Sequence, residues 1–139
     1  MPMPMAAAIA DAAPVHVLNW TAGWWLILSG FVVGAGLGLF FHRDDFWGGY
    51  ASFRRRIFRL GHIALEALGL LNLLFALSPW PRPGTWWAEA ASPCLVAGGV
   101  AMPCVCFLTA WKKSFRHLFA VPVLLLVLGV AFTLAGGGR

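Results

Sequence analysis

The chain has 139 residues, of which 60% are hydrophobic and 11% charged, and it carries a formal net charge of +5. With a mean hydropathy of +0.79, so few charged side chains cannot cover a soluble globular domain of this length, which excludes that class of protein. Four membrane crossings of about 20 residues each would leave no length for a separate soluble domain.

Residues 1–19 carry three prolines and no regular spacing of apolar residues, which predicts a weakly ordered extracytoplasmic tail. A short Ala-rich helix on the membrane surface is the alternative. Four apolar stretches follow within one domain, residues 20–139, and each has roughly the 17–25 residues that a helix needs to cross a bilayer. The predicted fold is an all-α membrane protein, a bundle of four transmembrane helices over about 20–41, 60–77, 94–111 and 118–136.

The distribution of basic residues predicts how these helices are oriented. Eight of the ten Lys and Arg residues fall in the first and third connections or beside them, and two, Arg82 and Arg139, fall on the opposite side. Because basic loops stay in the cytoplasm, we expect both basic loops to be cytoplasmic and both termini to lie outside. The expected location is the inner membrane of the cell, as a multi-pass protein.

The first predicted helix carries glycines at four-residue spacing, Gly30, Gly34 and Gly38. Glycines at this spacing share one helix face and let a second backbone approach closely. We expect the face to pack against another helix of the same chain, with a second copy of the chain as the alternative partner.

Polar side chains lie inside the second predicted helix. Glu66 lies about 10 Å inside the cytoplasmic boundary if that boundary is near Arg59, and an ionisable residue at such depth is a functional-site hypothesis. His62 lies one turn away on the same face, which makes it the expected partner of Glu66. Asn72 either continues the polar stripe or bonds to a neighbouring helix. His62, Glu66 and Asn72 form the candidate intramembrane polar site.

Three histidines belong to the predicted cytoplasmic half: His42, His62 and His117. With Cys106 they form a candidate ligand set for zinc, copper or iron, and His62 with His117 would suit a b-type haem. The sequence has no Cys-x-x-Cys-His motif and no His-x-x-x-His pair. Interfacial histidines also contact lipid headgroups, and Cys106 also fits as a small core residue. The first expectation is therefore no cofactor, with haem b or a transition metal as the alternative.

The basic loops have two interpretations. In one they only set the orientation and pair with Asp44 and Asp45. In the other they bind anionic lipid headgroups or a larger partner, with neighbouring aromatic residues in the interface. Either way the bilayer accounts for the positive charge, so we expect no nucleic-acid partner. The residues concerned are Arg54, Arg55, Arg56, Arg59, Lys112, Lys113 and Arg116.

The sequence contains no cofactor fingerprint, nucleotide-binding loop or catalytic motif. The predicted function is that of a small, non-enzymatic membrane protein, an accessory, scaffold or subunit of a larger membrane complex or a homo-oligomer. A small proton-coupled transporter that uses Glu66 is one alternative. A redox subunit that binds haem or metal through His62 and His117 is the other.

Overall fold

The computed structural model describes residues 14–137, and within that range the chain forms helices and no strands. Four helices in this range are long and apolar enough to cross a membrane, which confirms the predicted all-helical architecture with four spans. Two short 3₁₀ segments, η1 (Phe46–Gly48) and η2 (Lys113–Phe119), lie in the first and third connections. The long helices are α2 (Pro14–Phe40), α3 (Phe53–Leu77), α4 (Trp86–Trp111) and α5 (Ala120–Gly137).

The first three long helices begin earlier than predicted. Helix α2 begins at Pro14, where the fixed φ of proline suits the first helical position, so residues 14–19 are helical ahead of the start predicted at residue 20. The hydroxyl groups of Ser52 and Thr85 accept hydrogen bonds from the first turns of α3 and α4, so these helices begin at Phe53 and Trp86. The predictions for residues 1–13 lie outside the described residues.

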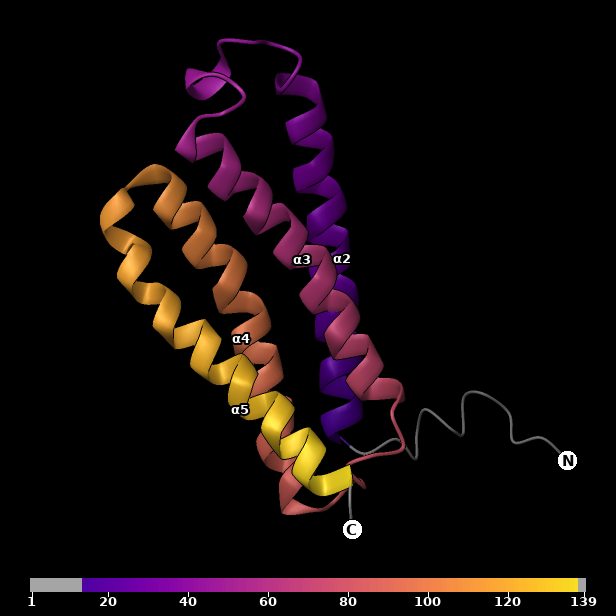
Figure 1. The fold of residues 1–139 in the computed structure, drawn as a ribbon. Coiled ribbons are helices and arrows are strands. Elements are labelled where there is room, and N and C mark those ends of the chain that lie inside the picture. The colour runs from indigo at the N-terminus through magenta and orange to yellow at the C-terminus, as the bar shows by residue number, and fades with distance from the viewer. Residues whose placement is uncertain (1–13, 138–139) are drawn as a thin grey trace, which may run out of the picture.

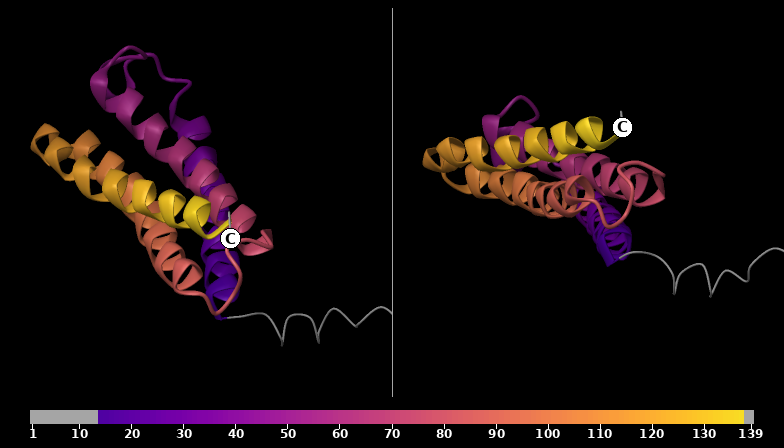
Figure 2. Two further views of the ribbon diagram at one scale, coloured as in Figure 1. Left: turned by 60° about the horizontal axis from the view of Figure 1, so that its bottom comes forward. Right: turned by 90° about the horizontal axis from the view of Figure 1, so that it is seen from below.

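The four helices form two antiparallel hairpins, α2–α3 and α4–α5, that come together at one end and diverge at the other (Figures 1 and 2). Helix α3 packs against both α2 and α4, whereas α5 packs chiefly on α4. The connections that carry η1 and η2 lie at the divergent end (Figure 1). In α5 only Pro122, Gly129 and Gly136 are buried within the chain, so the arrangement is an open bundle.

Close backbone contact joins α2 to α3 through glycines. A Cβ atom on Gly69 would lie 2.9 Å from the carbonyl oxygen of Gly23 and 2.7 Å from Cγ1 of Ile27. Further along α2, Gly30 lies against the side chain of Glu66 and Gly34 against that of His62. The glycine contacts of α2 with α3 thus run through Gly23, Gly30 and Gly34. A Cβ on Gly38 would meet no atom of residues 14–137 within 4 Å, so this third predicted glycine has open space.

Candidate functional site

Three helices meet at a buried cluster of polar side chains, Asn19 from α2, Asn72 from α3 and Ser92 from α4, each 0% exposed. Nδ2 of Asn19 donates a hydrogen bond of 2.8 Å to Oδ1 of Asn72. The hydroxyl of Ser92 donates to Oδ1 of Asn19. Nδ2 of Asn72 donates to the carbonyl oxygens of Leu68 at 2.9 Å and Leu95 at 3.4 Å. We name this set the Asn19–Asn72–Ser92 cluster.

The three side chains find their hydrogen-bond partners within the chain, as buried polar groups must where no water reaches them. Both amide groups have a donor and an acceptor contact, and no described polar atom of the three side chains is buried without a partner. Gly99 leaves space for the contact, because a Cβ there would lie 3.0 Å from Nδ2 of Asn72. The cluster therefore joins α2, α3 and α4.

Helix α2 adds one more polar contact near this cluster. Nδ1 of His16 lies 2.8 Å from the carbonyl oxygen of Ala76, and since a carbonyl only accepts, Nδ1 carries the hydrogen. Sequence reasoning singled out Asn72 but missed His16, Asn19 and Ser92. These three lie outside the helices predicted at 20–41 and 94–111, in segments that the sequence predicts to be tail or connection. A search for polar residues in the first turns of each span would have found them.

Glu66 and His62 occupy a different place, on the part of α3 that lies against α2. Glu66 lies roughly 20 Å from the first residue of α3 and roughly 17 Å from the last, so it is near the middle of the span. Both side chains are half-buried. Nδ1 of His62 is buried with no hydrogen-bond partner, and Glu66 forms no hydrogen bond or ion pair with any residue in 14–137.

The expected pairing of Glu66 with His62 is therefore absent from residues 14–137. The four-residue spacing does place both side chains on the α2 side of α3, over Gly30 and Gly34. Asn72 does not extend this pair, because its hydrogen bonds go to Asn19 and to backbone carbonyls. Of the three residues of the predicted polar site, Asn72 thus has hydrogen-bond partners within the chain. Glu66 and His62 have none within residues 14–137.

The predicted metal or haem ligands do not form a common set. Within residues 14–137 no group of three or more His, Cys, Asp or Glu side chains is placed to share a metal ion. His62 lies against α2, whereas His117 is exposed on η2, which packs on α4 and α5. His42 is exposed and contacts the carbonyl oxygen of Leu39, and Cys106 is buried beside Gly61. His62 and His117 consequently face different helices, because α5 packs on α4 and not across α3.

Comparisons with protein-family models, curated proteins and solved structures gave no match. The four apolar helices are compatible with a small integral membrane protein. Function must therefore be inferred from the geometry of this chain.

Basic side chains gather at the divergent end of the bundle with few acidic partners. The one ion pair within residues 14–137 joins Arg43 to Asp45 at 3.9 Å, and both side chains are mostly exposed. Such a pair contributes little. Arg55 is 2% exposed, and its Nη2 donates to the carbonyl oxygen of Phe41 at 3.1 Å, which ties the start of α3 to the end of α2. The ion pairs predicted with Asp44 and Asp45 are thus reduced to one exposed contact.

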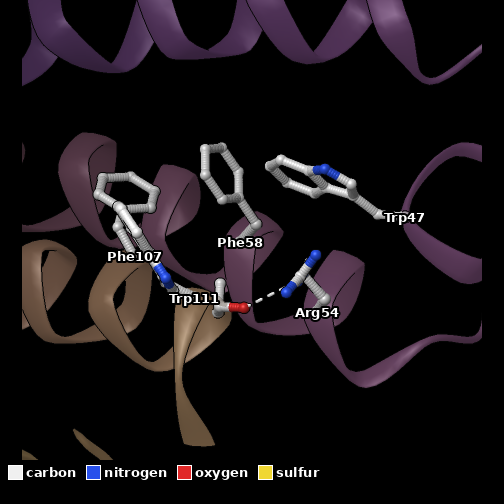
Figure 3. A pocket seen from close by; sticks show the side chains of 6 residues that line it. Trp47, Arg54, Phe58, Phe107 and Trp111 are labelled. Carbon is white, nitrogen blue, oxygen red and sulfur yellow. Dashed lines mark hydrogen bonds between the residues drawn. The ribbon is translucent and has the colours of Figure 1, made fainter.

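A cleft of about 400 Å³ opens between α3 and α4 at this end (Figure 3). Nε of Arg54 donates a hydrogen bond of 3.0 Å to the carbonyl oxygen of Ala110 and so links the two helices. The Trp47 backbone has a φ of +55°, an unusual conformation for a bulky residue, and its ring lies 5.0 Å from that of Phe58. The cleft is lined by Trp47, Arg54, Phe58, Phe107, Ala110 and Trp111.

Proposed function

We propose that this chain is a non-enzymatic integral membrane protein that serves as a subunit of a larger membrane assembly. The observation that supports the proposal is Glu66, an acidic side chain in the middle of a span with no partner in residues 14–137. A charged residue at the centre of a membrane helix costs about 2.5–3.5 kcal/mol of insertion free energy. Such residues are therefore rare in membrane helices and mark functional sites.

The contrast with the Asn19–Asn72–Ser92 cluster strengthens this inference. In that cluster every polar side-chain atom has a hydrogen-bond partner within the chain. Glu66 and His62 are left without such bonds although both lie at a helix contact. A polar group of another chain would supply the Glu66 carboxyl with the hydrogen-bond partner that it lacks within residues 14–137, and a hydrogen bond between membrane helices contributes about 1–2 kcal/mol.

Replacement of Glu66 tests the proposal. We expect Glu66→Ala to reduce the assembled fraction of the protein by at least about fivefold, since it removes that hydrogen bond. The matched control is Glu89→Ala, because Glu89 is an exposed carboxylate in the first turn of α4. The measurement is the ratio of assembled to single-chain particles in native membranes extracted with an amphipathic polymer. Equal ratios for the two variants would contradict the role given to Glu66.

A small proton-coupled transporter is the second candidate, and the unpaired Glu66 carboxyl also favours it. A carboxyl without internal partners is free to bind and release a proton as a substrate moves. Glu66→Gln separates the two functions, because the amide keeps hydrogen-bonding capacity but cannot release a proton. A subunit would keep its assembly in Glu66→Gln, whereas a transporter would insert normally and lose proton flux in proteoliposomes.

We also propose that both basic connections face the cytoplasm of a cell whose inner membrane holds the protein, with both termini outside. The clustering of basic residues at one end of the bundle supports this orientation. Reporter fusions test it: alkaline phosphatase joined after Arg139 should be active, and green fluorescent protein at the same place should be dark. The reverse pattern would show the opposite orientation.

A further inference from the structure

The cleft between α3 and α4 combines an apolar interior with one positioned cation. Its walls are aromatic rings from three elements, η1, α3 and α4 (Figure 3). Trp47 comes from η1, Phe58 from α3, and Phe107 and Trp111 from α4. Its volume of about 400 Å³ falls in the range of small-ligand sites, roughly 300–1,000 Å³. In a bilayer, the hydrocarbon chain of any lipid could fill the apolar part of such a cleft. Selection among lipids would therefore depend on the headgroup that contacts the cation, Arg54.

The guanidinium of Arg54 is held in place at this cleft. Its Nε bonds to the carbonyl oxygen of Ala110, and its central carbon lies 5.9 Å from the centre of the Trp47 ring. The two terminal nitrogens have no acidic partner within residues 14–137. A guanidinium fixed through Nε presents those terminal nitrogens to an anion, and two parallel hydrogen bonds to a phosphate suit this geometry.

A second cation, Lys113, contacts the turn of α3 that carries Arg54. Nζ of Lys113 lies 5.3 Å from the centre of the ring of Phe53, the residue that precedes Arg54 in α3. Lys113 also has no carboxylate partner in the described part of the chain. Neither Arg54 at the cleft nor Lys113 over the neighbouring Phe53 is paired with a carboxylate in residues 14–137, and this unpaired positive charge complements an anionic group.

We propose that the cleft binds one anionic phospholipid, with the lipid phosphate on Arg54 and the upper part of an acyl chain between Phe58, Phe107 and Trp111. The aromatic walls favour a lipid over a soluble anion, because a soluble anion would leave them empty. The proposal requires that the helices span a membrane, but it does not depend on a protein partner at Glu66.

The test of this site is the binding of phosphatidylglycerol to the detergent-purified protein, measured by native mass spectrometry. We expect Arg54→Gln to weaken binding about fivefold, the effect of one cation beside an anionic lipid. Arg54→Lys should lose part of the affinity, because it keeps the charge without the fixed planar group. The matched control is Arg56→Gln, since Arg56 is exposed on the same turn and does not line the cleft. Its affinity should stay near that of the wild type.

Three outcomes would overturn the proposal. Equal losses in Arg54→Gln and Arg56→Gln would show a diffuse charge effect without a site. Equal binding of phosphatidylglycerol and phosphatidylcholine would remove the role of the anion. Competition by the tail-free headgroup glycerophosphoglycerol at the same concentration as the lipid would show that the apolar cleft is unused. Glu66→Ala should retain lipid binding, so a failure of the subunit proposal remains distinguishable from a failure here.

Discussion

Replacement of Asn72 by leucine should destabilise the protein by about 2 kcal/mol, because it leaves Nδ2 of Asn19 buried without its acceptor. The substitution keeps a similar volume, so the expected loss comes from hydrogen bonding and not from a cavity. The measurement is the free energy of unfolding in mixed micelles titrated with a denaturing detergent.

The matched control for this experiment is Thr133→Val on α5. The Thr133 hydroxyl bonds only to the carbonyl oxygen of Gly129 in its own helix, so we expect a change within about 0.5 kcal/mol. The double variant Asn19→Leu with Asn72→Leu should cost less than the sum of its single changes, since both partners of one bond are removed together. Wild-type stability in Asn72→Leu would contradict the structural role of the cluster.

Gly69→Ala should also destabilise the protein, by about 1–3 kcal/mol, because a methyl group at this position overpacks a close contact. The added Cβ would lie 2.9 Å from the Gly23 carbonyl oxygen, which is backbone and cannot rotate away. Helices α2 and α3 would have to separate. The same detergent titration measures the loss.

Gly36→Ala provides the comparison for Gly69→Ala, because a Cβ on Gly36 meets no described atom within 4 Å. Alanine forms helix better than glycine, so we expect Gly36→Ala to be neutral or stabilising by up to about 1 kcal/mol. If both variants lost the same stability, the effect would come from helix propensity or lipid contact and not from the α2–α3 approach.

The four spans could be predicted because length and hydropathy alone specify a helix that crosses a bilayer. Their first turns could not, since hydropathy does not respond to the caps of Ser52 and Thr85 or to a helix that begins at Pro14. That difference of a few residues hid Asn19 and Ser92, which became visible as a cluster only when α2 and α4 were extended to include them.

Spacing predicted which residues share a helix face but not what that face meets. His62 and Glu66 are one turn apart as expected, yet they lie over Gly34 and Gly30 without bonding to each other. The hypothesis that His62 and His117 share a haem required α5 to pack across α3. The structure places α5 on α4, and no local pattern in the sequence determines that choice.

The mass of the wild-type protein, extracted from native membranes in polymer-bounded discs without detergent, most directly tests whether it is a subunit. After subtraction of the lipid and polymer, we expect a protein mass well above the 15.0 kDa of one chain, made up of further copies or of a second protein. Recovery of a single chain alone, at the expression level of the native membrane, would contradict the proposed function.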